Sequence, residues 1–142
     1  MIDQPVGSVM TRSVRTVSPE ITACEVARTF ADHGIGSVLV VAADGDAPLG
    51  IVTQSDVMRA VADEADLTTT RAKTLMSAPL VTTTSGAEIH EAAAVMRDRS
   101  IRRLPVLDGE ELVGILTTTD LAHYLPRLRN TILRERADAE DG

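Results

Sequence analysis

Two segments of the chain repeat apolar residues at positions i, i+3, i+4 and i+7, the spacing of one helical face. They lie at residues 23–30 and 89–96. Each begins at residues with the spacing of a capping box, Thr22 with Glu25 and Ser85 with Glu88. The pattern therefore predicts two amphipathic helices, each starting near its cap.

Short runs rich in Val, Leu and Ile predict strands around these helices. The predicted strands are, in chain order, residues 14–17, 38–41, 49–52, 80–83, 104–107 and 112–116. Asp44-Gly45 and Asp108-Gly109 are turn-forming pairs between neighbouring runs, so each copy should contain a hairpin. A further helix is predicted to begin near Ser55 and near Thr119. The order is β-α-β-β-α, twice, an α+β (α/β-like) fold.

The two halves of the chain are copies of one repeat. A shift of 66 residues superimposes residues 6–41 on 72–107, and a shift of 64 superimposes 50–56 on 114–120, where both copies read G-I-aliphatic-T-x-x-D. The resulting division is a first repeat, a connector, a second repeat, and a C-terminal helix with an acidic tail, at residues 6–62, 63–71, 72–125 and 126–142. Because each repeat is short, we expect the two to pack about a pseudo-two-fold axis and share one core.

Composition narrows the class of protein further. The 142 residues are 44% hydrophobic and 25% charged, as in a globular protein, and are too few for an α/β barrel of about 250 residues. A formal net charge of −7 argues against nucleic acid or anionic lipid as a partner. The sequence has neither a signal pattern nor the roughly 18 apolar residues of a membrane span. With its single cysteine, Cys24, it predicts a cytoplasmic protein without membrane insertion.

Three motifs recur in the same order in both copies. They are V-M-T or L-M-S at residues 9–11 and 75–77, an aliphatic strand segment that reads I-R-R-L-P-V at 101–106, and the closing G-I-aliphatic-T-x-x-D. With the β-α-β-β-α order, they resemble a tandem pair of CBS domains, called a Bateman module, over about residues 6–125. The resemblance implies a sensor without an attached effector, which binds AMP, ADP, ATP or S-adenosylmethionine between its repeats. It also implies a homodimer that signals to a partner protein the sequence does not identify.

The closing motif is a candidate nucleotide contact. In each copy a predicted strand ends at Thr53 or Thr117 and a helix follows at once, so free N–H groups and the positive end of the helix dipole can meet a phosphate. Asp56 and Asp120 are placed to accept hydrogen bonds from a ribose diol. The alternative is that T-x-x-D only caps its own helix.

Arg102 and Arg103 distinguish the second copy from the first, which has Gly36 and Ser37 at these positions. The resemblance implies that basic residues here reach phosphate groups, and a guanidinium suits bidentate phosphate contact. We therefore predict a charged nucleotide around Thr117 and Asp120, and weaker or uncharged adenosine binding in the first copy, where Ser37 takes the arginines' place. The alternative is a surface ion pair of the arginines with Asp98 or Glu111.

Thr16 and Thr82 complete the candidate ligand contacts. They occupy equivalent positions on the predicted first strands, which in this family line the adenine pocket, although a purely structural role explains them equally well. Phe30 and Tyr124 are the only aromatic residues, so aliphatic side chains would have to sandwich the base.

Two other functions compete with the sensor. One is an adaptor that dimerises constitutively and has no physiological ligand. The other is an enzyme, since paired repeats of this kind also occur as an insertion in IMP dehydrogenase; here no catalytic motif is present, and we expect no catalytic residue or cofactor. Cys24 and His90 are equivalent by the repeat, but two ligands are too few for structural zinc, so no metal is expected.

Overall fold

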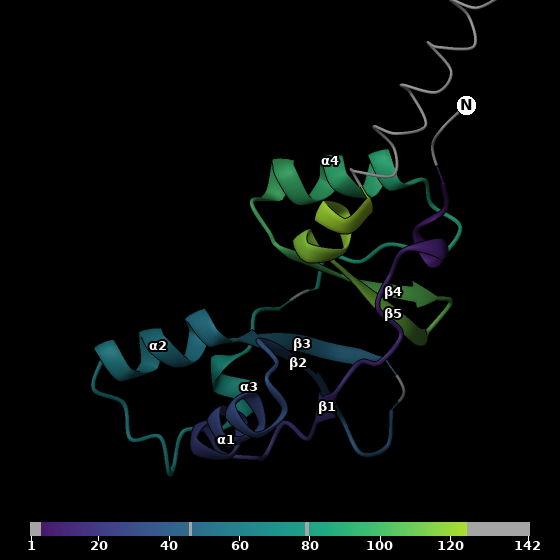
Figure 1. Cartoon of the computed structure of the whole chain (residues 1–142). Coiled ribbons are helices and arrows are strands. Elements are labelled where there is room, and N and C mark those ends of the chain that lie inside the picture. Colours follow the sequence, from purple (N-terminus) through teal and green to yellow (C-terminus); the bar gives the residue numbers. More distant parts are fainter. Residues whose placement is uncertain (1–3, 46, 79, 125–142) are drawn as a thin grey trace, which may run out of the picture. The chain divides into compact units, whose positions relative to one another are not determined.

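A computed structural model describes residues 4–45, 47–78 and 80–124 (Figure 1). The predicted C-terminal helix and acidic tail at 126–142 lie outside these residues. The elements are, in chain order, η1 (Val6–Ser8), β1 (Thr16–Val17), α1 (Ala23–His33), β2 (Ser37–Val41), β3 (Pro48–Thr53), α2 (Gln54–Ala62), α3 (Ala72–Leu75), α4 (Ile89–Arg99), β4 (Arg103–Asp108) and β5 (Glu111–Thr117). Residues 118–124 are helical as well.

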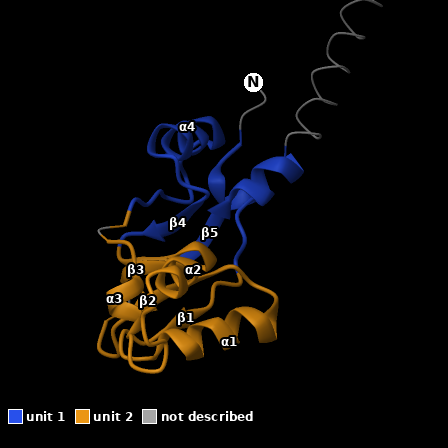
Figure 2. Ribbon diagram, turned by 90° about the vertical axis from the view of Figure 1, so that its left-hand side faces the viewer, with its two compact units in different colours: residues 1–12, 81–109, 113–142 blue, residues 13–80, 110–112 orange. Residues whose placement is uncertain are grey.

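The chain forms two compact units, shown in blue and orange in Figure 2. Unit 1 consists of residues 1–12, 81–109 and 113–142, and unit 2 of residues 13–80 and 110–112. These units are not the two sequence repeats. The opening residues of each repeat belong to the unit that holds most of the other repeat.

Unit 2 is built on a three-stranded sheet in the order β1-β2-β3. β1 runs parallel to β2, and β2 and β3 form the antiparallel hairpin that the sequence predicts. The N-terminal cap of α1 is Thr22, whose hydroxyl oxygen accepts the N–H of Glu25 at 3.2 Å, and the helix ends at Gly34 in the left-handed conformation (φ 62°). Buried side chains from α1, the sheet and α3 form its core: Val26, Phe30, Val38, Val40, Val52 and Ala72.

Unit 1 repeats this arrangement with fewer regular strands. β4 and β5 form a hairpin over a two-residue connection, in which Gly109 has φ 65°. Thr83 adds a parallel bridge at Val106 of β4, and Thr11 adds an antiparallel bridge at Ile115 of β5. The core combines both ends of the unit's sequence: Val6, Met10, Ala92, Met96, Leu104, Val106 and Leu116.

Each opening motif pairs with the closing strand of the other repeat. Thr11 exchanges two backbone hydrogen bonds with Ile115, both 2.9 Å, and Ser77 exchanges two with Ile51, at 3.2 and 2.9 Å. The strand edge of each unit is therefore completed by residues from the other copy of the repeat. Only the last residue of each opening motif, Thr11 or Ser77, pairs as a strand residue, and this pairing satisfies the backbone groups at the edge.

Several local predictions are confirmed and two are wrong. Residues 80–83 do not form the predicted strand, because only Thr83 pairs, through a single bridge to Val106. The apolar faces predicted at residues 23–30 and 89–96 lie on α1 and α4 and are mostly buried. The predicted capping box of Ser85 does not form, because α4 has Glu88 as its N-terminal cap residue without a side-chain hydrogen bond. Ser85 instead donates from its N–H and its hydroxyl to the two carboxylate oxygens of Asp108, at 3.0 and 2.6 Å. The short helices η1 and α3 are not predicted by the pattern.

Among the residues that the structure describes, no helix has both the length and the apolar character needed to cross a membrane.

Candidate functional site

The first candidate site lies where β3 passes directly into α2. The backbone N–H of Thr53 donates to Oδ2 of Asp56 at 2.7 Å, and the Thr53 hydroxyl donates to the same oxygen at 3.1 Å. Both side chains are half-buried. The carboxylate of Asp56 thus closes the first turn of α2 through one of its two oxygens.

The second candidate site has the same position between β5 and the helix at 118–124. The N–H of Thr117 donates to Oδ2 of Asp120 at 2.9 Å, and the N–H of Asp120 donates to the Thr117 hydroxyl oxygen at 3.1 Å. This is a reciprocal capping box. The motif therefore caps its helix in both copies. An ionised carboxylate accepts about four hydrogen bonds, so capping does not exhaust either aspartate.

The arginine pair lies beside the second turn. The N–H of Thr118 donates to the backbone oxygen of Arg102 at 3.0 Å, which brings Arg102 and Arg103 to the start of the helix at 118–124. In unit 2 the equivalent bond runs from Gln54 N–H to the Gly36 oxygen at 3.1 Å and brings Ser37 to the start of α2. Arg102 and Arg103 thus lie next to the turn at Thr117, and Gly36 and Ser37 lie next to the turn at Thr53, as the repeat alignment predicts.

Among the described residues, no acidic side chain forms an ion pair with either arginine. Arg102 is exposed and Arg103 is half-buried. Asp98, one of the alternative partners, pairs with Arg97 instead at 3.2 Å. Burial, and then the charge of Arg102, lowers the pKa of Arg103 below its ordinary value. A partly desolvated cation beside a like charge favours an anion as its neighbour.

Thr16 and Thr82 lie on segments that pair with β2 and β4, respectively. Thr16 is exposed on β1 and pairs with Leu39, two residues along β2 from Ser37. Thr82 is also exposed and precedes Thr83, which bridges to β4. Thr16 therefore lies on the outer strand of the unit 2 sheet, whereas Thr82 lies in an irregular segment beside β4, and neither hydrogen-bonds to the capping residues among the described positions.

Thr11 contacts the second candidate site, and the sequence did not predict this contact. Its hydroxyl donates to Oδ1 of Asp120 at 2.9 Å, the carboxylate oxygen that the Thr117 N–H leaves open. The signal was present in the V-M-T motif, whose threonine aligns with Ser77 of L-M-S. No local pattern, however, indicates that residue 11 reaches residue 120.

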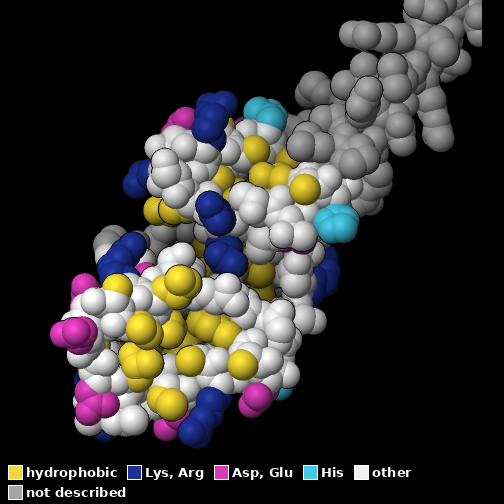
Figure 3. All heavy atoms as spheres, turned by 60° about the vertical axis from the view of Figure 1, so that its left-hand side comes forward, with side chains coloured by type: hydrophobic (Ala, Val, Ile, Leu, Met, Phe, Trp, Pro, Cys, Tyr) yellow, Lys and Arg dark blue, Asp and Glu magenta, His cyan; other side chains and the backbone are white. Residues whose placement is uncertain are grey.

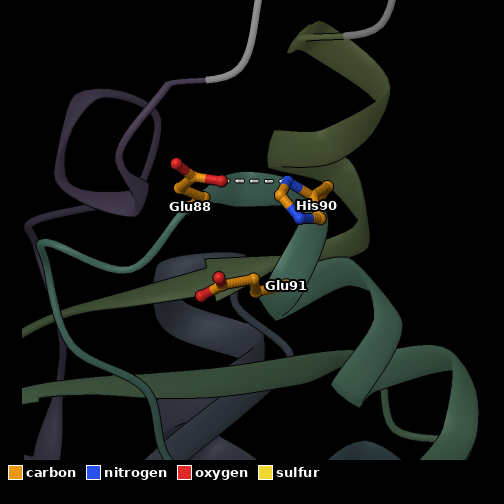
Figure 4. A group of neighbouring side chains, drawn as sticks. All are labelled: Glu88, His90 and Glu91. Atoms are coloured by element: carbon orange, nitrogen blue, oxygen red, sulfur yellow. Dashed lines mark ion pairs between the residues drawn. The ribbon is translucent and has the colours of Figure 1, made fainter.

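A cluster of Glu88, His90 and Glu91 is the alternative site for a metal ion in the described part of the chain (Figure 4). Its ligand atoms lie within 4.8 Å of one another, and His90 Nδ1 is 3.3 Å from a Glu88 carboxylate oxygen. All three side chains are exposed or only half-buried, at the N-terminal end of α4. Because the positive end of a helix dipole disfavours a cation, the cluster is better explained as solvated first-turn residues.

Comparison with known proteins places these features in a family. The CBS domain is matched at residues 6–63 and 72–127. An uncharacterised protein of Methanopyrus kandleri is 40% identical over 132 residues, 92% of this chain and 67% of that protein. An uncharacterised protein of Methanocaldococcus jannaschii is 29% identical over 95% of this chain, but the match spans 35% of that protein's length.

Solved structures agree with the sequence match. A CBS-domain protein of Burkholderia ambifaria, described as a putative signal-transduction protein, has a TM-score of 0.79 at 31% identity and covers 86% of this chain and 93% of its own. A CBS-domain protein of Pyrobaculum aerophilum, solved in complex with AMP, has a TM-score of 0.80 at 29% identity and covers 89% and 99%. With two family matches over most of its length and these two likenesses, the chain belongs to the CBS-domain family.

Proposed function

We propose that this protein is a regulatory module that binds adenosine nucleotides at its strand-to-helix turns. The observation that carries the proposal is the arrangement of Arg102 and Arg103 beside Thr117 and Asp120 in unit 1. Two guanidinium groups without an ion-pair partner among the described residues, and a carboxylate with open acceptor positions, match a molecule that carries phosphate at one end and a ribose diol in the middle. The AMP complex of the Pyrobaculum aerophilum relative supports this ligand class.

Each group has a separate task in the proposed site. Arg103, which is half-buried, binds the phosphate, and exposed Arg102 adds a second contact that suits a longer phosphate chain. Asp120 accepts the ribose hydroxyls with the acceptor positions that capping leaves open. Thr82, in the irregular segment next to β4, contributes to the adenine pocket through its backbone. AMP, ADP and ATP all fit this division, and S-adenosylmethionine fits it without the phosphate contact.

The site in unit 2 is proposed to be the weaker one. Ser37 stands beside Thr53 and Asp56 without a positive charge, and Thr16 on β1 is the equivalent of Thr82 by the sequence repeat. A neutral adenosine moiety suits these groups better than a phosphate, because no cation compensates its charge. The two sites should therefore differ in the charge of the ligand that they prefer.

The proposal includes an output through protein association rather than catalysis. Figure 3 shows hydrophobic side chains gathered at the surface of unit 2, where Met58 and Val61 of α2 are 72% and 57% exposed. We propose that these side chains are buried in a homodimer, and that nucleotide changes the affinity of the dimer for a partner protein. Ligand can do this only if it binds two states unequally. The proposal places the module in the cytoplasm, since its single cysteine suits a reducing compartment.

Thermal denaturation with AMP, ADP, ATP, S-adenosylmethionine and adenosine tests the proposal. A ligand at 100 times its dissociation constant should stabilise the folded state by about 2.7 kcal/mol. Titration calorimetry of Asp120→Asn and Asp56→Asn then assigns the sites, because each variant should lose only the binding at its own turn. An unchanged melting temperature with all five ligands would contradict the sensor and favour the constitutive adaptor. Turnover of inosine monophosphate would instead indicate an enzyme.

A further inference from the structure

The hydroxyl of Thr11 contacts the aspartate on which the proposed nucleotide site depends, although the two residues are separated by 109 positions. We propose that Thr11 is a positioning residue of the unit 1 site, which fixes the Asp120 carboxylate for the ribose and links nucleotide binding to docking of residues 4–12. This inference rests on the proposed function, and it names a residue and a coupling that the function does not require.

Thr11 and the helix cap hold the Asp120 carboxylate at both oxygens. Oδ2 accepts the Thr117 N–H at 2.9 Å, and Oδ1 accepts the Thr11 hydroxyl at 2.9 Å. A carboxylate held by one oxygen can rotate, whereas one held by both keeps its plane. Each oxygen retains about one acceptor position, so the pair is oriented in advance for two neighbouring ribose hydroxyls. A site that needs no reordering binds more tightly.

Thr11 is itself anchored well enough to position another residue. Its N–H and carbonyl oxygen both bond to Ile115 at 2.9 Å, on the strand that leads to Asp120. The preceding residue, Met10, is 9% exposed and belongs to the core of unit 1. A β-branched side chain on a fixed backbone has few rotamers, so its hydroxyl has a defined direction.

The other unit provides an internal comparison. Ser77 is equivalent to Thr11 and makes the same pair of backbone bonds, to Ile51, but no side-chain hydrogen bond joins it to Asp56 in the described chain. There Oδ2 of Asp56 receives both the N–H and the hydroxyl of Thr53. The unit 2 aspartate is therefore held by its own turn alone, which gives the two sites different degrees of preorganisation.

The same contact makes the opening segment sensitive to ligand. Residues 4–12 are held on unit 1 by buried Val6, by the N–H of Val6 on the Ala87 oxygen at 2.8 Å, and by Thr11. If docking of Thr11 raises nucleotide affinity, bound nucleotide must strengthen that docking by the same factor. The chain passes into unit 2 after Arg12, so this segment leads from the proposed site to the other unit.

The experiment compares the full chain with Thr11→Val, Thr11→Ser and Ser77→Ala. Valine keeps the shape of threonine without the hydroxyl, serine restores the hydroxyl, and Ser77→Ala is the matched change in unit 2. We expect Thr11→Val to weaken ATP binding in calorimetry by about tenfold, the low end of the range for a lost hydrogen bond to a charged group. Thr11→Ser should recover most of the affinity, and Ser77→Ala should bind ATP like the unmodified chain.

Hydrogen exchange separates positioning from a general loss of stability. Without ligand, Thr11→Val should speed exchange of the Thr117 amide, whose acceptor is the Asp120 carboxylate, while the buried amides of β4 stay protected. With ATP, residues 4–12 should become more protected in the unmodified chain and less so in Thr11→Val. Unchanged ATP affinity and unchanged Thr117 exchange in Thr11→Val would overturn the role of Thr11 and leave the nucleotide function standing. Failure of the unmodified chain to bind ATP would overturn the function, and this role with it.

Discussion

Met10 lies so close to Gly114 that its Sδ is 2.6 Å from the position a Cβ on that glycine would occupy. Met76 has the same relationship to Gly50 in unit 2, at 2.7 Å. In both units the methionine belongs to the opening motif of one repeat and the glycine to the closing motif of the other. The glycine at the start of G-I-aliphatic-T-x-x-D is therefore a packing requirement, because any side chain there would displace the opposite strand.

Replacing Gly114 with alanine should destabilise the protein by about 1–3 kcal/mol, the usual cost of overpacking a core. The new Cβ would meet the backbone oxygen of Thr11 at 2.9 Å, so a side-chain movement alone cannot relieve the clash. Urea denaturation measures the effect. Gly86→Ala is the control, because a Cβ at Gly86 meets nothing within 4 Å. Equal stability of the two variants would show that the strand moves freely.

Arg103→Gln should weaken ATP binding by about ten- to a hundredfold and leave adenosine binding unchanged, since a hydrogen bond to a charged group contributes about 1.5–3 kcal/mol. The half-buried guanidinium of Arg103 has no ion-pair partner among the described residues, so its charge is free for a phosphate. Calorimetry with both ligands gives the comparison. Arg97→Gln, which removes an exposed arginine paired with Asp98, is the matched control. A loss of equal size for adenosine and ATP would indicate damage to the fold instead.

Ser85 should make the protein more stable at neutral pH than at acid pH. Its hydroxyl, and then its N–H, lower the pKa of Asp108 from the ordinary 3.8. A carboxyl group whose pKa is lower in the folded state stabilises that state above the unfolded pKa and loses the effect as pH falls through the folded one. The gap in melting temperature between the unmodified protein and Ser85→Ala should therefore be full above about pH 3.8 and narrow below it.

A pH-independent gap would contradict this origin of the stability. Ser13→Ala is the control for the series, because Ser13 is exposed and its hydroxyl has no hydrogen-bond partner in the described chain. It should leave the melting temperature close to that of the unmodified protein at every pH.

Val61→Glu should convert the proposed dimer to a monomer without unfolding it. Val61 is 57% exposed at the end of α2, so the change costs little inside the protomer and places a charge in an apolar interface. Sedimentation equilibrium and circular dichroism measure association and fold separately. Arg28→Gln on α1 changes the net charge by the same amount at another exposed position and should stay dimeric. A dimer that survives Val61→Glu must use a different surface.

Local sequence patterns predicted the elements that depend on neighbouring residues. The apolar faces of α1 and α4, the β2–β3 hairpin and the start of α2 directly after Thr53 follow from spacing and turn chemistry. Ser85 is the exception, because its N–H and hydroxyl donate to the carboxylate of Asp108, distant in sequence, and the hydroxyl does not cap α4. A locally predicted cap does not form where a residue distant in sequence accepts two hydrogen bonds from the capping candidate, because the cap would provide only one.

The sequence by itself determined the doubled β-α-β-β-α unit and identified the threonine, aspartate and arginine positions of the candidate site. The repeat singles out these positions, because the threonine and aspartate are shared by both copies and the arginines differ between them. Only the tertiary structure decided that the opening motif of each repeat completes the sheet of the other, and that Thr11 reaches Asp120. Those contacts join residues far apart in the chain. Their energy comes from satisfied edge-strand hydrogen bonds and from the packing of Met10 and Met76, which the local hydrophobic pattern does not predict.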